Sequence, residues 1–158
     1  LLWPSSIERF AALAEQIQKE AKAYQGDIST YPELIQRSFD PELLAALDAL
    51  KAAWLAHNTS SPEAELLWLA ITAILRPCSK AGTAQWQYIL PNKTKKKVLH
   101  PTLAFRQQIE MMQDDMRSMQ LHSDRSYAEL VAGDARAAAT LVNHQVDAVI
   151  TSPHLLGD

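Results

Sequence analysis

Apolar positions recur three and four residues apart through most of the first 120 residues, the spacing that places them on one face of a helix. The first stripe follows Ser5 and Glu8, which resemble a capping box, and we expect Gly26 to end that helix. An Asp-Pro pair at 40–41 and a Ser-Pro pair at 61–62 predict two more helix starts, because Asp and Ser cap helices and proline fits their first position.

The helix that follows Ser61 is apolar most of the way round, so we expect it to be the most buried helix and to end at Pro77. A fourth helix is predicted from Pro101. Its apolar residues again step by four and three, and we interpret its methionines as core filling. The positions of this stripe are Phe105, Ile109, Met112, Met116 and Met119.

Residues 77–100 have a different character from the helices around them. Residues 86–90 predict a short strand, and the Pro-Asn pair at 91–92 predicts a turn after it. A basic segment follows at residues 93–97 and holds four of the chain's eight lysines, namely Lys93, Lys95, Lys96 and Lys97.

After residue 125 the pattern becomes that of an α/β unit. Residues 127–132 and 146–151 predict two short strands, with a short helix over residues 135–142 between them. Two strands do not form a stable sheet alone, so this part looks incomplete. The predicted fold is therefore mainly α, with a helical region at residues 1–125 and a partial α/β part at residues 126–158.

Composition narrows the function classes. The 158 residues are 47% hydrophobic and 21% charged, as in an ordinary globular protein. The four glycines lie too far apart for a G-x-G-x-x-G fingerprint or a P-loop, so if the chain uses a nucleotide-like cofactor, the glycine-rich cradle lies elsewhere. The net charge of −3 argues against the whole chain as an electrostatic binder of nucleic acid.

Metal and membrane classes are also disfavoured. The one cysteine, Cys78, allows neither an internal disulfide nor a cysteine-based metal site, and we interpret it as a packing residue. The five histidines include no pair at the helical i, i+4 spacing, so no metal site is expected. No apolar run has the roughly 18 residues of a membrane span, and a reducing cytoplasm is the expected compartment.

Two polar residues follow the predicted strands at the ends where open α/β sheets bind ligands. Asp134 comes just after the first strand and Ser152 just after the second. A carboxylate at such a position can accept hydrogen bonds from an exocyclic amine or a sugar hydroxyl. The alternative for Asp134 is that it simply caps the helix that follows.

These residues resemble part of a known enzyme family. Residues 146–153, which end in Thr-Ser-Pro, are similar to the approach to the Thr-Ser-Pro-Pro-Tyr motif of S-adenosylmethionine-dependent amino DNA methyltransferases. The strand with Gly-Asp-Ala-Arg at residues 133–136 resembles the preceding strand of that family, and residues 74–88 resemble a helical insertion that some members carry. The resemblance implies a Rossmann-like methyltransferase sheet, of which residues 126–158 would supply two parallel strands.

The family implies roles for individual residues. Asp134 would contact the adenine of S-adenosylmethionine, and Ser152 and Pro153 would hold the amino group of a base flipped out of the duplex. Methyl transfer to cytosine N4 or adenine N6 would then proceed by positioning and electrostatics, without a metal. Serine at the first motif position leans toward cytosine N4. His154 and Leu155 depart from the motif, because leucine cannot stack on a flipped base as the family's aromatic residue does.

The resemblance leads to two hypotheses from different classes. The first is that the chain is a truncated or frame-shifted part of a site-specific DNA methyltransferase, inactive alone and completed by the remainder of that domain. Its basic segment would touch DNA phosphates, with Trp86 and Tyr88 near enough to stack on bases. The second is a non-enzymatic helical module that binds DNA or protein. Under both hypotheses, the alternative for the basic segment is that its four lysines form a solvated loop that aids solubility.

Overall fold

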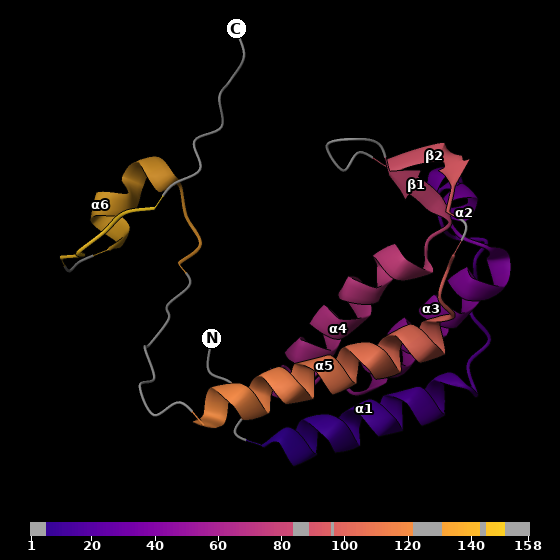
Figure 1. The fold of residues 1–158 in the computed structure, drawn as a ribbon, viewed down its shortest axis with the longest axis horizontal. Helices are drawn as coiled ribbons and strands as arrows, with labels where there is room; N and C mark the ends of the chain where they lie inside the picture. Colours follow the sequence, from indigo (N-terminus) through magenta and orange to yellow (C-terminus); the bar gives the residue numbers. More distant parts are fainter. Residues whose placement is uncertain (1–5, 84–88, 96, 122–130, 143–144, 151–158) are drawn as a thin grey trace, which may run out of the picture. The chain divides into compact units, whose positions relative to one another are not determined.

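Four long helices pack against one another in residues 2–125, which form one unit of the chain, while residues 126–158 belong to a second unit. The computed structural model describes residues 6–83, 89–95, 97–121, 131–142 and 145–150. The four helices are α1 (Ile7–Ala21), α3 (Pro41–Ala56), α4 (Pro62–Cys78) and α5 (Pro101–Leu121), and each is in contact with the other three (Figure 1). The chain is therefore mainly helical, as predicted.

The core of this unit lies between the four helices and uses the stripes that the sequence predicts. Apolar side chains at three- and four-residue spacing turn inward because their burial removes hydrocarbon from water. Met112 and Met116 fill the core from α5, whereas Met119 is 52% exposed, so the core-filling interpretation is wrong for that methionine. The most deeply buried large side chains are Phe10, Ile17, Leu67, Ile74, Phe105 and Met116.

The helix starts follow the local signals closely. Ser6, one residue later than predicted, caps α1 by accepting the N–H of Arg9, and Ser61 caps α4 by accepting the N–H of Ala64. The Asp40 side chain makes no capping bond to α3 and instead forms an ion pair with Lys80. Local sequence therefore fixes where the helices begin, but a tertiary contact decides where the Asp40 carboxylate points.

Gly26 has a different role from the predicted one. Helix α1 ends at Ala21 with Lys22 as its cap, four residues before the glycine. A Cβ atom at Gly26 would lie 2.1 Å from the carbonyl oxygen of Ala45 on α3, and its backbone is not in the left-handed region. Glycine is needed here because the loop passes directly over the backbone of α3.

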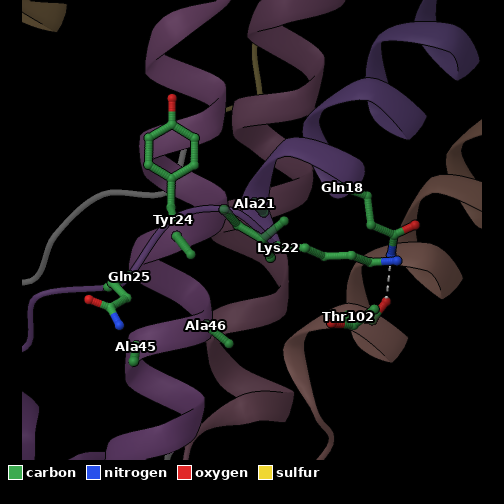
Figure 2. Close-up of a pocket in the computed structure, with 11 residues that line it drawn as sticks. Gln18, Ala21, Lys22, Tyr24, Gln25, Ala45, Ala46 and Thr102 are labelled. Carbon is green, nitrogen blue, oxygen red and sulfur yellow. Dashed lines mark hydrogen bonds between the residues drawn. The ribbon is translucent and has the colours of Figure 1, made fainter.

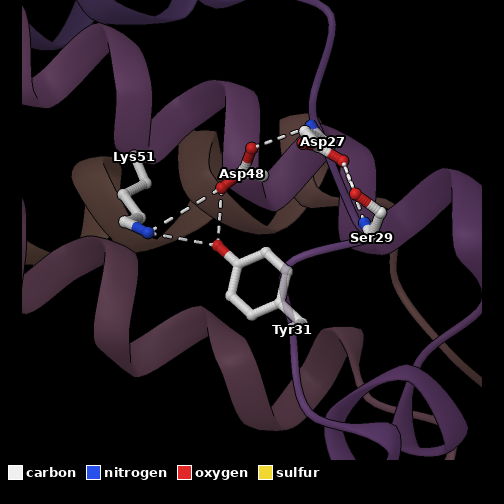
Figure 3. Close-up of polar contacts among 5 residues, drawn as sticks. All are labelled: Asp27, Ser29, Tyr31, Asp48 and Lys51. Atoms are coloured by element: carbon white, nitrogen blue, oxygen red, sulfur yellow. Dashed lines mark hydrogen bonds and ion pairs between the residues drawn. The ribbon is translucent and has the colours of Figure 1, made fainter.

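A polar network fastens this loop to α3. Asp48 accepts hydrogen bonds from the Tyr31 hydroxyl and from the backbone N–H of Asp27, and Lys51 Nζ donates to the Tyr31 oxygen at 3.2 Å (Figure 3). Asp27 in turn accepts from the N–H and hydroxyl of Ser29. The loop leads into a short helix, α2 (Glu33–Ser38), which the sequence analysis did not predict.

Two short antiparallel strands connect α4 and α5. Strand β1 (Ala81–Thr83) pairs with β2 (Ile89–Thr94), and an irregularity in the register leaves residues 91–93 between the partners of Ala81 and Gly82. The strand predicted from residue 86 falls partly outside the described residues. The turn predicted at Pro91 is wrong, because this proline lies inside β2, where the bulge removes the need for its missing N–H.

The C-terminal unit has the predicted short helix, whereas the strand predicted at residues 127–132 lies mostly outside the described residues. A turn of 3-10 helix (Ala135–Ala137) continues into α6 (Ala138–Leu141). Among the described residues of this unit none is in a strand, and Val149 and Ile150 are 80% and 98% exposed. The prediction of a buried strand at 146–151 is therefore not met at residues 146–150, because a strand needs a neighbour to complete its hydrogen bonds.

Candidate nucleic-acid interface

Positive charge is concentrated in one stretch of this acidic chain. Residues 66–109 contain seven lysines and arginines and no aspartate or glutamate, so this acid-free stretch has a formal charge of +7. The other 114 residues carry eight basic and 18 acidic residues, so the net charge of −3 hides a strong asymmetry. The charge pattern was available in the sequence, but the overall net charge obscured it.

The acid-free stretch is continuous in space as well as in sequence. It comprises most of α4, the two strands, the connection to α5 and the first half of α5, and α4 packs along α5 (Figure 1). Among the described residues, two acidic side chains from outside the stretch form ion pairs with it, Asp40 with Lys80 at 3.0 Å and Glu110 with Arg106 at 3.9 Å. This part of the helical unit therefore carries an excess of basic over acidic residues and includes the basic segment.

Lys95, one of the four predicted DNA-binding lysines, is turned inward. Its ammonium donates a hydrogen bond to the carbonyl oxygen of Arg76 in the last turn of α4. Burial, followed by the nearby charge of Arg76, lowers the pKa of the Lys95 ammonium from its ordinary value. A cation at a helix C-terminus is favourable, because the final carbonyls of a helix have no partner within it.

Backbone hydrogen bonds hold the same connection along the end of α4. The N–H of Lys95 donates to the carbonyl of Lys80 at 2.8 Å, and the N–H of Leu99 donates to the carbonyl of Pro77 at 3.1 Å. These two bonds lie on either side of Lys97. The backbone is therefore anchored at Lys95 by a residue just after α4 and at Leu99 by the last turn of α4.

The remaining cations of the acid-free stretch differ in what they contact. Arg76 Nη1 donates to the carbonyl of Ala81, and Arg106 lies 3.9 Å from Glu110. Lys97 is exposed, and within the described residues no ion pair or hydrogen bond to its side chain is found. The side chains of Lys93 and Lys96, and the predicted stacking residues Trp86 and Tyr88, lie outside what the structure describes.

Helix α4 buries six of its 17 residues, a larger share than α1 or α3, and it also exposes apolar side chains. Its outward face carries Trp68, Leu69 and Leu75, which are 38%, 57% and 41% exposed. The ring of Trp68 stacks on that of Trp54, with centroids 4.5 Å apart. The acid-free stretch therefore combines positive charge with exposed hydrocarbon, including the aromatic ring of Trp68.

Asp134, the predicted cofactor residue, caps the short helix after it. Its carboxylate accepts the backbone N–H of Arg136 at 2.9 Å and hydrogen bonds from the guanidinium of the same residue, the shortest at 2.6 Å. These contacts, the side-chain bonds first, hold the pKa of the Asp134 carboxyl below its ordinary value. A donor amine that bound Asp134 would replace the exposed Arg136 side chain. Ser152 and Pro153 lie outside the described residues.

A separate hollow of about 540 Å³ lies between the end of α1, α3 and the start of α5 (Figure 2). Alanines of α3 form much of its wall, and Lys22 is the one charged residue among the residues that line it. The amide of Gln18 donates to the carbonyl of Thr102 across one side. None of the predicted site residues lines this hollow, so it does not form part of the candidate interface.

Cys78 behaves as the packing residue that we predicted. It is fully buried at the end of α4, and burial raises the pKa of its thiol to about 11. A thiol with such a pKa is almost entirely protonated at neutral pH and is therefore a poor nucleophile.

Comparisons with protein-family models, curated proteins and solved structures give no match to this chain. In the part that the structure describes, every helix is too short or too polar to cross a bilayer.

Proposed function

We propose that this chain is the DNA-contacting helical part, with a piece of the catalytic core, of a cytoplasmic DNA amino methyltransferase. The enzyme would transfer a methyl group from S-adenosylmethionine to cytosine N4 or adenine N6. The observation that carries the DNA-binding part is the acid-free stretch, which places seven positive charges from the last turn of α4, along the two strands and the connections beside them, to the first turns of α5. Lysines on such a surface bind DNA by displacing counterions from phosphates.

The catalytic part of the proposal rests on residues 133–153. Asp134 is held ionised beside a short helix, so it can act only as a hydrogen-bond acceptor for the amine of the donor. The exposed apolar residues 146, 149 and 150 suit a strand that other strands of the same sheet would bury. Ser152 and Pro153 would follow that strand and hold the flipped base.

DNA binding is tested by the salt dependence of affinity for a labelled 20-base-pair duplex. Replacing Lys93, Lys96 and Lys97 by glutamine should weaken binding equally for unrelated sequences and lower the slope of log K against log salt by up to about 2.7. Replacing Arg9, Lys19 and Lys22 by glutamine removes the same charge from outside the acid-free stretch and should leave the slope unchanged. Equal slopes for both variants would contradict the proposal.

The methyltransferase assignment is tested by donor binding. The chain would be joined to the segment that carries the glycine-rich loop, and calorimetry would measure its affinity for S-adenosylmethionine. We expect binding that is lost in Asp134→Ala. Failure of the joined protein to bind the donor would exclude the enzyme assignment while leaving the DNA result intact.

The second candidate function is a helical interaction module without catalytic activity. The exposed face of α4, with Leu69 and Leu75, is the observation that favours it, because large apolar side chains at a surface are typical of binding sites. Under this function, donor binding stays absent in the joined protein, and Leu69→Gln with Leu75→Gln abolishes capture of a protein partner without affecting DNA affinity.

A further inference from the structure

Lys95 and Lys97 lie two residues apart but occupy different surroundings. The ammonium of Lys95 contacts the Arg76 carbonyl at the end of α4, whereas the Lys97 side chain is exposed. Helix α4 leaves its last carbonyls without partners within the helix. Lys95 Nζ and the Leu99 N–H supply partners for two of them, those of Arg76 and Pro77. The connection is thus part of the C-terminal capping of α4.

This capping fixes where Lys97 can be. The backbone is held at Lys95 by its bond to Lys80 and at Leu99 by its bond to Pro77, so Lys97 lies between two anchored backbone positions. A cation on an anchored backbone loses less conformational freedom when it contacts a phosphate than one on a free loop does. The ammonium of Lys95, already bonded and partly buried, is not available for the same contact.

We propose that Lys95 is a positioning residue that docks the basic segment onto the end of α4 and thereby presents Lys97 to a DNA phosphate. This inference rests on the proposed DNA-binding function. It gives Lys95 and Lys97 different roles, because their contacts differ although they are alike in the sequence.

A double-mutant cycle on the full 158-residue chain tests it, with Lys95→Met, Lys97→Met and the combined variant. Methionine keeps most of the apolar stem of lysine and removes the ammonium. Affinity for the labelled duplex is measured from 50 to 200 mM NaCl at a temperature where circular dichroism shows each variant to be folded. Backbone amide exchange at Lys95 and Leu99 is measured by NMR in the same samples.

Lys97→Met should lower the salt slope by about 0.9, the value for one phosphate contact, without changing amide exchange. Lys95→Met should leave the slope within about 0.3 of the wild type, weaken affinity about twofold to fivefold, and speed exchange at Leu99. In the combined variant the effect of Lys95→Met on affinity should vanish, because there is no longer a Lys97 ammonium to position.

Two results would overturn the inference. The first is a slope reduction of about 0.9 in Lys95→Met with unchanged exchange at Leu99, which would make Lys95 a direct phosphate contact. The second is an additive loss of affinity in the combined variant. If the wild-type chain shows no salt-dependent affinity, the proposed function fails, whereas the anchoring role of Lys95 is still decided by amide exchange.

Discussion

The hydroxyl oxygen of Tyr31 lies 2.5 Å from Oδ1 of Asp48, and this bond ties the loop after α1 to the middle of α3. The other carboxylate oxygen of Asp48 accepts the N–H of Asp27, and Lys51 Nζ contacts the same hydroxyl. The Asp48 carboxylate therefore organises a loop that otherwise has little regular structure.

Tyr31→Phe should lower the free energy of unfolding by about 1 kcal/mol, because it removes one hydrogen bond to a carboxylate while keeping the ring. Urea denaturation followed by circular dichroism measures the loss. Tyr24→Phe, on the exposed part of the same loop, is the matched control and should be neutral. Equal stability of the Tyr31→Phe variant and the wild type would show that the bond adds nothing.

The same network predicts loss of stability at alkaline pH. Burial and the bond to Asp48 raise the pKa of Tyr31, and the bond to Tyr31 raises the pKa of Lys51. Stability from groups whose folded-state pKa is raised is complete below the unfolded value, about 10, and is lost as pH rises through the folded value. The decrease in thermal midpoint between pH 9 and pH 11 should therefore be smaller in Tyr31→Phe. An identical decrease would contradict the coupling.

Gly26→Ala should destabilise the helical unit by about 1–3 kcal/mol, because the new methyl group meets the backbone of α3 at Ala45. At an unstrained site the same change stabilises by about 0.4–1 kcal/mol. Gly133→Ala is the control, since its Cβ meets only the terminal methyl group of Leu141, which can rotate away. Thermal unfolding of both variants distinguishes the effects, and a stabilised Gly26→Ala would refute the close approach.

Glu20 and His57 join the ends of α1 and α3 through a contact of 2.6 Å. Hydrogen bonds from Gln16 and then from His57 lower the pKa of Glu20 below its ordinary value of 4.5. The stabilisation is therefore present above that value and is lost as pH falls through the lower folded-state value. Glu20→Gln should show a smaller decrease in thermal midpoint between pH 6 and pH 3 than the wild type or the control Glu15→Gln. Equal decreases would count against the pair.

The carboxyl group of Asp134 should titrate below its ordinary pKa in the isolated chain, and Arg136→Gln should raise that pKa. NMR titration of the side-chain carboxyl carbon measures both values. Because the pKa is lowered, the capped turn is stable above the unfolded value of Asp and loosens as pH falls through the folded one. No change in the titration of Asp134 in Arg136→Gln would show that the guanidinium contact is absent in solution.

Local signals predicted the starts of the long helices, because a capping side chain and a first-position proline act within one turn. Helix α2 was missed because it follows Pro32 without a side-chain cap and spans only six residues. The strand expected at residues 146–151 has the composition of a buried strand, but a strand forms only with a neighbour, which the sequence of one strand cannot provide.

The candidate interface was predictable in part. The cluster of lysines at residues 93–97 was evident in the sequence. The absence of acidic residues over 66–109 could also have been read from the sequence, and it would have extended the predicted interface beyond these lysines. The inward direction of Lys95 could not be predicted, because it depends on a carbonyl of α4 that is 19 residues away in sequence. The role of Gly26 could not be predicted either, because it depends on the contact between its loop and helix α3.

The separation of charge has a practical consequence for how the protein behaves during purification. Residues 2–125 have a formal charge of zero, so the +7 of the acid-free stretch is balanced by −7 elsewhere in the same unit. A chain with an isoelectric point near 5.9 would ordinarily pass through a cation-exchange or heparin column at pH 7.5. We expect this chain to be retained, because seven basic residues follow one another over residues 66–109 with no acidic residue among them, and the column would show this separation of charge before any DNA is added.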